Sequence, residues 1–389
     1  MIDKPHFIIK NKSQQYDSGR GGFLFENILT PEILADVCKR ITGKTEYSCT
    51  FDNQGYNKGR MAMLTYDGNI SFVSFSDHKA DGRNKSMQSV PTALMSYYEE
   101  YNLSKRIFFY FLPSADNHET NYFHFMYRLM LTAGIEFLNH EEYLSRELHS
   151  FVSVEDLVLA KNSNRERNSS NNSSYVTIGS DHVIQIYGKT YGANKYESTM
   201  FCIALSRLSA DRIELYQICE QNLSVLPQRC TNVINSLGNV KMISTNLTME
   251  REEFNKKGSL RSPRYIYNLL AKLGHKKCAL CGCEIPELIQ GAHIWSVAAI
   301  KRESGIGIDD KVRFATDGDN GIWLCENHHK MLDEDIITID MTGAVSKRAD
   351  IKGKNADFIT WATPTHQIEK QIMTDKFLEY LQKRYGISA

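Results

Sequence analysis

The sequence of 389 residues lacks both a net charge and a long apolar run. Its 46 Lys and Arg residues balance 46 Asp and Glu residues, so no overall field draws the chain to nucleic acid or to a membrane, and any such attraction must be local. No apolar stretch approaches the ~18 residues that span a bilayer. The first 22 residues contain no apolar core of signal-peptide length. We therefore expect a soluble, cytoplasmic protein without membrane contacts.

The length predicts two or three domains, because single cores seldom grow beyond ~250 residues. Two polar stretches mark candidate boundaries: the Asn- and Ser-rich residues 161–175, and the charged residues 250–262. We predict an N-terminal α/β domain for DNA recognition at 1–160, a second α/β module at 175–250 and a nuclease domain at 256–389. The last of these rests on the motifs described below.

The segments on either side of the first boundary share one order of strand, loop, helix, strand, helix and strand. Each has a Gly-x-Asn-Lys turn after its first strand, at residues 82–85 and 192–195. This predicts an α/β fold of two similar modules, a possible duplication, with a small parallel sheet and crossover helices. Two unrelated α/β halves are the alternative. Lys85 and Lys195 would begin helices and could contact phosphate, unless both turns are ordinary surface turns.

The nine cysteines are unevenly placed, and four of them lie between residues 278 and 325. Cys278 and Cys281 have the C-x-x-C spacing of a zinc knuckle, and Cys325 and His328 have C-x-x-H spacing. Together they predict a closed tetrahedral zinc site of structural type. Cys283 is left over and could replace one of the four. The alternative is a set of ordinary core cysteines.

A second group of polar residues follows the zinc ligands. His329 and Asp333 are four residues apart, which places them on one face of a helix, where they could hold one divalent ion. His293 and Asn320 complete the group.

The motifs CALC (278–281), AHI (292–294), DNGIWLC (319–325) and HHKMLD (328–333) resemble the HNH, or ββα-metal, nuclease family over residues 278–340. The resemblance implies a β-hairpin, a loop and a helix. On these, His293 would be the general base, Asn320 would orient that histidine, and His329 would bind Mg²⁺ or Mn²⁺. Many family members carry a metal-binding Asp or His just before the base, where this chain has Ala292; Asp333 could compensate.

Residues 256–277 contain seven Lys or Arg and no acid, a local excess suited to a phosphate backbone. A solvated basic linker is the alternative. Ser262, Pro263 and Gly274 delimit a short helix within this segment. Residues 366–386 predict an amphipathic helix for packing or for a homodimer. The expected DNA contacts here are Lys256, Lys257, Arg261 and Arg264.

We expect a site-specific double-stranded DNA endonuclease, a restriction enzyme with structural zinc and a catalytic divalent metal. The alternative is an antiviral effector nuclease gated by a nucleotide second messenger. Cleavage without added nucleotide separates these two. A third interpretation, a zinc module that only binds DNA, is opposed by His293, Asn320 and His329 at family spacing.

Overall fold

The computed structural model describes residues 4–10, 29–52, 61–75, 93–99, 105–113, 121–163, 174–190, 194–219, 226–256 and 262–387. By contacts the chain divides into two compact units. Unit 1 comprises residues 1–164, 191–210 and 226–240, and unit 2 comprises residues 165–190, 211–225 and 241–389. Within the described residues, none of the helices combines the length and the apolar character needed to cross a membrane.

Unit 1 contains a six-stranded sheet of order β2-β1-β3-β4-β5-β6. β4 and β5 pair in parallel, as do β5 and β6, whereas β3 is antiparallel to both β1 and β4. The apolar side chains of β1, β3, β4 and β5 form a core with helix α2. The strands are β1 (His6–Lys10), β2 (Ser48–Asp52), β3 (Met61–Tyr66), β4 (Asn69–Phe75), β5 (Lys105–Tyr110) and β6 (Glu136–Phe137).

Helices of unit 1 also pack on one another. α4 contacts α6, with the Phe125 and Phe201 rings 6.0 Å apart, and α6 contacts α7. Arg229 of α7 forms an ion pair with Glu99, in the helical residues 93–99. The remaining elements are α2 (Pro31–Thr42), α4 (Asn121–Thr132), η1 (His140–Glu142), α5 (Val154–Ser163), α6 (Asn194–Leu208) and α7 (Gln228–Ser236).

The second sheet has four strands in the order β10-β9-β8-β7. They are β7 (Ser174–Ile178), β8 (Ile184–Lys189), β9 (Ile213–Ile218) and β10 (Val240–Thr245), with η2 (Ser180–His182) between the first two. β7 and β8 are antiparallel, and β8 and β9 are parallel. The succession β7-β8-β9-β10 therefore repeats the order of β3-β4-β5-β6, each beginning with an antiparallel pair.

The strands expected to be parallel do pair in parallel, β4 with β5, β5 with β6 and β8 with β9. Both sheets are nevertheless mixed, because an antiparallel strand, β3 or β7, precedes each set. The antiparallel pair β3–β4 closes at Asp67 and Gly68, which have φ values of 47° and 75°. Asp-Gly with both residues at positive φ is the favoured two-residue hairpin turn. The Asp-Gly pair between two apolar stretches was the signal in the sequence for this hairpin.

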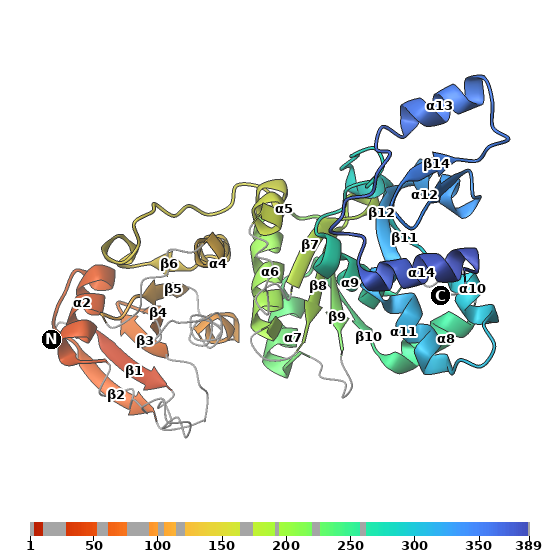
Figure 1. Cartoon of the computed structure of the whole chain (residues 1–389). Helices are drawn as coiled ribbons and strands as arrows, with labels where there is room; N and C mark the ends of the chain where they lie inside the picture. The colour runs from red at the N-terminus through yellow and green to blue at the C-terminus, as the bar shows by residue number, and fades with distance from the viewer. Residues whose placement is uncertain are drawn as a thin grey trace. The chain divides into compact units, whose positions relative to one another are not determined.

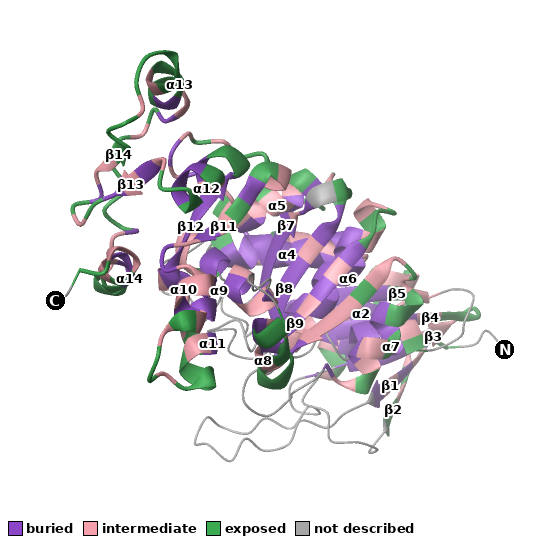
Figure 2. Cartoon of the chain, turned by 90° about the vertical axis from the view of Figure 1, so that its right-hand side faces the viewer, coloured by how far each residue is buried: buried purple, intermediate pink, exposed green. Residues whose placement is uncertain are grey.

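The C-terminal part of unit 2 packs α9 and two small hairpins into one apolar core (Figure 2). β11 and β12 pair antiparallel, with His293 opposite Gly321. The elements are α8 (Leu247–Lys256), α9 (Pro263–Leu273), η3 (Pro286–Leu288), β11 (Ile289–His293), α10 (Val297–Arg302), α11 (Ile308–Thr316), η4 (Gly318–Asn320), β12 (Gly321–Cys325), α12 (Glu326–Asp333), β13 (Ile337–Ile339), β14 (Val345–Lys347), α13 (Lys354–Ala362) and α14 (Asp375–Tyr385).

Helix boundaries follow the capping residues. α9 begins after Ser262, whose hydroxyl accepts from the backbone N–H of Arg264, and ends at Gly274, as expected. The predicted C-terminal helix is shorter than residues 366–386. It begins only after Thr374, whose hydroxyl caps the backbone N–H of Phe377. Of the residues 366–374 before it, only Ile368 and Ile372 are buried, and the segment is not helical.

Candidate active site and metal centre

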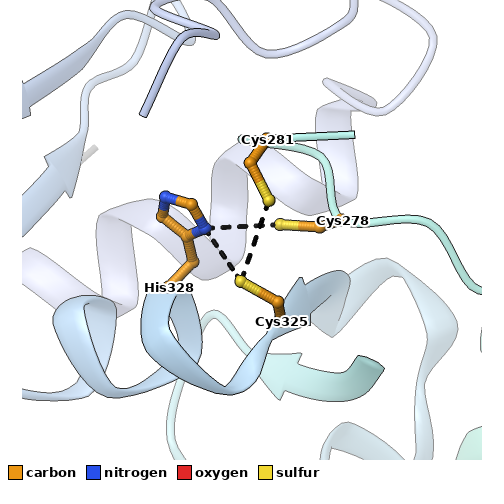
Figure 3. A group of neighbouring side chains, drawn as sticks. All are labelled: Cys278, Cys281, Cys325 and His328. Atoms are coloured by element: carbon orange, nitrogen blue, oxygen red, sulfur yellow. Dashed lines mark hydrogen bonds between the residues drawn. The ribbon is translucent and has the colours of Figure 1, made fainter. Parts of the chain in front are cut away.

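Three cysteines and one histidine meet where the loop before η3 approaches the start of α12 (Figure 3). His328 Nδ1 lies 3.0 Å from Cys325 Sγ and 3.5 Å from Cys278 Sγ. Cys281 Sγ lies 3.8 Å from Cys325 Sγ. A tetrahedral ion with Zn–S bonds of about 2.3 Å separates two sulfurs by about 3.8 Å. The cluster is therefore consistent with structural zinc.

The knuckle is a tight turn built for these thiols. Backbone N–H groups of Cys278 and Gly282 donate to the carbonyls of Cys283 and Cys278 across the turn. Gly282 has a φ of +70°, a conformation that favours glycine. Cys283 thus closes the turn through its backbone, and its thiol lies outside the cluster. The N–H of Ala279 donates to the carbonyl of Trp323, joining the knuckle to β12.

The surroundings of the cluster support metal binding. His328 presents Nδ1 to the sulfurs, and its Nε2 lies 3.1 Å from the hydroxyl of Thr363. Such a second contact fixes the orientation of a ligating ring. Burial raises the pKa of the Cys278 thiol, but hydrogen bonds from the His328 ring and from backbone N–H groups outweigh it and lower the pKa overall. A thiolate is the form that binds zinc.

His293 is the last residue of β11 and is held on two sides. Its Nε2 lies 2.9 Å from the carbonyl oxygen of Ala315, so Nε2 carries the proton and Nδ1 keeps the lone pair. The Tyr265 ring stacks on the imidazole with centroids 4.0 Å apart and planes at 11°. Burial lowers the pKa of His293 to about 4; the Ala315 carbonyl opposes this shift and His329 adds to it. The imidazole is therefore neutral at pH 7.

Tyr265 was missed by the sequence reasoning. It lies on α9, is 2% exposed, and its hydroxyl has no hydrogen-bond partner among the described residues. The hairpin accommodates it with glycines. A Cβ added to Gly321 would lie 2.3 Å from the Tyr265 hydroxyl, and one added to Gly291 would lie 2.5 Å from Leu269. Glycine at both positions lets α9 lie directly against the strand pair that carries His293.

Replacing Tyr265 with leucine is expected to lower the cleavage rate at least tenfold, because a loosened imidazole spends less time in its reactive position. The substitution also exposes the His293 imidazole to solvent, so the pKa of His293 rises from about 4 toward its ordinary value. Only the neutral imidazole can accept a proton. As the pH is lowered, the variant would therefore lose activity at a higher pH than the wild type does. Rate profiles against pH measure both effects.

Tyr265→Phe is the matched control. It keeps the stacked ring and removes only a buried hydroxyl without a partner, so activity should match the wild type and stability should not fall. Equal losses for the two variants, or an unshifted acid limb for Tyr265→Leu, would contradict a role for the stack.

Asn320 is fully buried and bonds to backbone rather than to the His293 ring. Its Oδ1 accepts from the N–H of Trp295 at 2.7 Å, and its Nδ2 donates to the carbonyls of Trp295 and Phe314, each at 3.0 Å. Trp295 follows His293 by two residues, and Phe314 precedes Ala315. The amide thus joins the end of β11 to the segment whose carbonyl holds the imidazole.

Helix α14 holds the same region from outside. Arg384 donates to the carbonyl of Ile294 at 3.2 Å and to that of Leu332 at 2.5 Å. These carbonyls belong to the residue after His293 and to α12. Tyr380 donates to Asp317, three residues before Asn320. The C-terminal helix therefore fixes the spacing between β11 and α12.

His329 and Asp333 lie on one face of α12, with His329 Nδ1 and Asp333 Oδ2 3.9 Å apart. Both side chains are partly exposed. Ala292 points into the core and offers no ligand. Among the described residues, the cluster of three cysteines and His328 is the one group of three or more His, Cys, Asp or Glu side chains close enough for a metal. A two-ligand site suits an ion such as Mg²⁺, which keeps several waters and also binds substrate phosphate.

The residues expected to contact DNA lie in different surroundings. Arg264 donates to Glu250 at 3.0 Å and to the carbonyl of Cys219 at 2.7 Å, so its guanidinium already has two partners within unit 2. Lys256 is exposed beside Glu252. Lys195 lies over the Tyr196 ring in the first turn of α6. Lys85, Lys257 and Arg261 lie outside the described residues.

Comparison with known families gives a class to this region. Residues 278–340 match the model of a family described as HNH endonuclease. These residues are therefore an HNH endonuclease domain, which implies nuclease activity and a nucleic acid substrate. No curated protein matches the chain in sequence.

Proposed function

We propose that the protein is an endonuclease that cuts double-stranded DNA at specific sites, with His293 as general base. The observation that carries this proposal is the arrangement of β11, η4 and α12. Within the HNH domain, they bring His293, Asn320 and His329 into one module pinned by the candidate zinc cluster.

His293 has the chemistry that the first step needs. With Nε2 donating to Ala315, the Nδ1 lone pair can take a proton from water at pH 7. The water oxygen then attacks the phosphorus, and the bond from phosphorus to the 3′-oxygen breaks. Asn320 is a positioning residue that acts through the backbone on either side of the imidazole. Tyr265 limits the rotation of the ring.

His329 and Asp333 would hold the catalytic divalent ion, Mg²⁺ or Mn²⁺. When bound, such an ion stabilises the negative charge on the leaving oxygen. The exposure of both side chains supports this assignment, because the substrate phosphate must reach the same position. The two residues leave most coordination positions to water and phosphate.

The restriction role rests on the region before the nuclease domain. About 250 residues precede the predicted nuclease domain, a size suited to a dedicated recognition region, and we propose that Lys85 and Lys195 contact phosphates there. Lys256, Lys257 and Arg261 would contact phosphates from the start of the nuclease domain. A homodimer would let two nuclease domains act on the two strands.

A second candidate is an effector nuclease gated by a nucleotide. The observation that favours it is the repeated strand order β3-β4-β5-β6 and β7-β8-β9-β10. The helical contacts of unit 1 have the same symmetry. By their place after the corresponding strands, residues 93–99 match α6, and α4 matches α7. The contact of α4 with α6 therefore has a counterpart in the contact of α7 with residues 93–99. A duplicated α/β region of this kind supports a nucleotide-sensing role.

One assay separates the candidates. The zinc-loaded protein is incubated with Mg²⁺ and unmodified phage DNA, with no nucleotide added. We expect discrete fragments that disappear when Mg²⁺ is omitted. Cleavage that begins only when cyclic nucleotides are added would favour the second candidate, and DNA binding without cleavage under either condition would refute both.

A further inference from the structure

Helix α13 carries an exposed aromatic pair outside the matched domain. Trp361 is 79% exposed and Phe358 is 50% exposed, with ring centroids 6.2 Å apart. Ile359 is the one residue buried in this helix. Figures 1 and 2 both show α13 standing out from the rest of its module. Large exposed aromatics on a projecting element mark an interaction surface.

The base of this helix is fixed to the zinc cluster. Thr363, two residues after Trp361, is buried, and its hydroxyl lies 3.1 Å from Nε2 of His328. The N–H of Thr365 donates to the carbonyl of Leu280 in the knuckle at 3.1 Å. The aromatic pair is therefore held in a set position on the nuclease module, so a partner would meet a preorganised surface.

The charges beside the aromatic pair are positive. Residues 345–365 contain four Lys or Arg and two Asp, a net charge of 4 − 2 = +2 in a chain of net charge zero. Arg348 is paired with Asp350. Lys352 and Lys354 are exposed and have no ion-pair partner among the described residues. Lysines that neutralise phosphates, beside large apolar side chains that can insert between base steps, are the chemistry of contact with duplex DNA.

We propose that α13 is a DNA-contacting arm: Trp361 and Phe358 insert between base steps of the duplex beside the cleavage site, while Lys352 and Lys354 bind flanking phosphates. A second copy of the chain is the competing occupant. A symmetric contact would bring two copies of this positively charged patch together, and the repulsion between them favours DNA. The inference rests on the proposed function, because it takes the nuclease substrate as the partner.

Tryptophan fluorescence tests the arm directly. The chain has three tryptophans, and Trp295 and Trp323 are 3% and 2% exposed, so quenching by neutral acrylamide reports chiefly on Trp361. In the full-length zinc protein with Ca²⁺ in place of Mg²⁺, a bound duplex is expected to shield most of the quenchable emission. Trp361→Phe should lose that quenchable component with or without DNA.

Affinity measurements divide the arm into its two parts. Trp361→Ala is expected to weaken DNA binding about tenfold, with the salt dependence unchanged. Replacing Lys352 and Lys354 with glutamine should flatten the salt dependence by about two units of slope.

Two outcomes would overturn the arm. One is a bound duplex that leaves Trp361 accessible while Trp361→Ala binds normally. The other is shielding that grows with protein concentration in the absence of DNA, which would assign the surface to a second copy. Wild-type cleavage is followed in parallel. If DNA is cut but does not shield Trp361, only the proposal for α13 is refuted. If DNA is neither bound nor cut, the proposed function is refuted, and the proposal for α13 with it.

Discussion

Replacing Cys278 with serine is expected to unfold the nuclease module rather than to slow a folded enzyme. The cluster joins the knuckle to α12 through four side chains, and structural zinc supplies folding free energy to such modules, about 10–16 kcal/mol in zinc-finger peptides. Loss of one thiolate should remove the bound zinc and abolish cleavage. Elemental analysis should give one zinc per wild-type chain, and thermal melts should show an early transition in the variant.

Cys283→Ser is the control for the same knuckle. Its thiol lies outside the cluster, and Cys283 contributes a backbone carbonyl that serine keeps. It should therefore retain zinc and activity. A metal-free wild type that melts at the temperature of the zinc-loaded protein would refute a structural site.

Replacing His293 with alanine is expected to lower cleavage by about 10²–10⁴-fold, the usual contribution of a general base, with DNA affinity nearly unchanged. The variant lacks the lone pair that takes the proton, but it removes neither a zinc ligand nor a proposed phosphate contact. Single-turnover cleavage and equilibrium binding to one duplex measure the two quantities separately.

The exposed His366 provides a comparison, and His366→Ala should cut at the wild-type rate. If His293→Ala loses DNA binding in proportion to activity, His293 is a contact or structural residue and the proposed mechanism is wrong. The zinc content of the variant must match that of the wild type, because His293 lies on the strand next to β12.

The sequence predicted the metal cluster well because its ligands come in two pairs at local spacing. C-x-x-C and C-x-x-H each fit one turn, so little needs to be known of the fold between them. The same holds for α9, whose capping residues Ser262 and Gly274 are adjacent to its ends. Features that depend only on residues close together in the sequence can be predicted without knowledge of the tertiary structure.

Contacts between distant elements could not be found in this way. The stack of Tyr265 on His293 joins a helix and a strand 28 residues apart, and no periodicity signals it. The partners of Arg264 could not be found from the sequence either, because Glu250 and the Cys219 carbonyl, which hold its guanidinium, lie 14 and 45 residues away. The start of α14 was misplaced because Ile368 and Ile372 are buried in an irregular segment that happens to have helical spacing.

The position of α9 has a consequence for the portability of the nuclease. One side of α9 covers Gly291 and Gly321 of the hairpin, while Tyr267 on the same helix packs edge-on against Tyr175 of β7, 5.3 Å between centroids. α9 also contacts β8 and β9. A fragment cut at residues 278–340 would leave the glycine surface bare and the His293 ring without its stack. Transplanting the catalytic unit into another protein would therefore require α9 and α14, together with a surface to replace the four-stranded sheet.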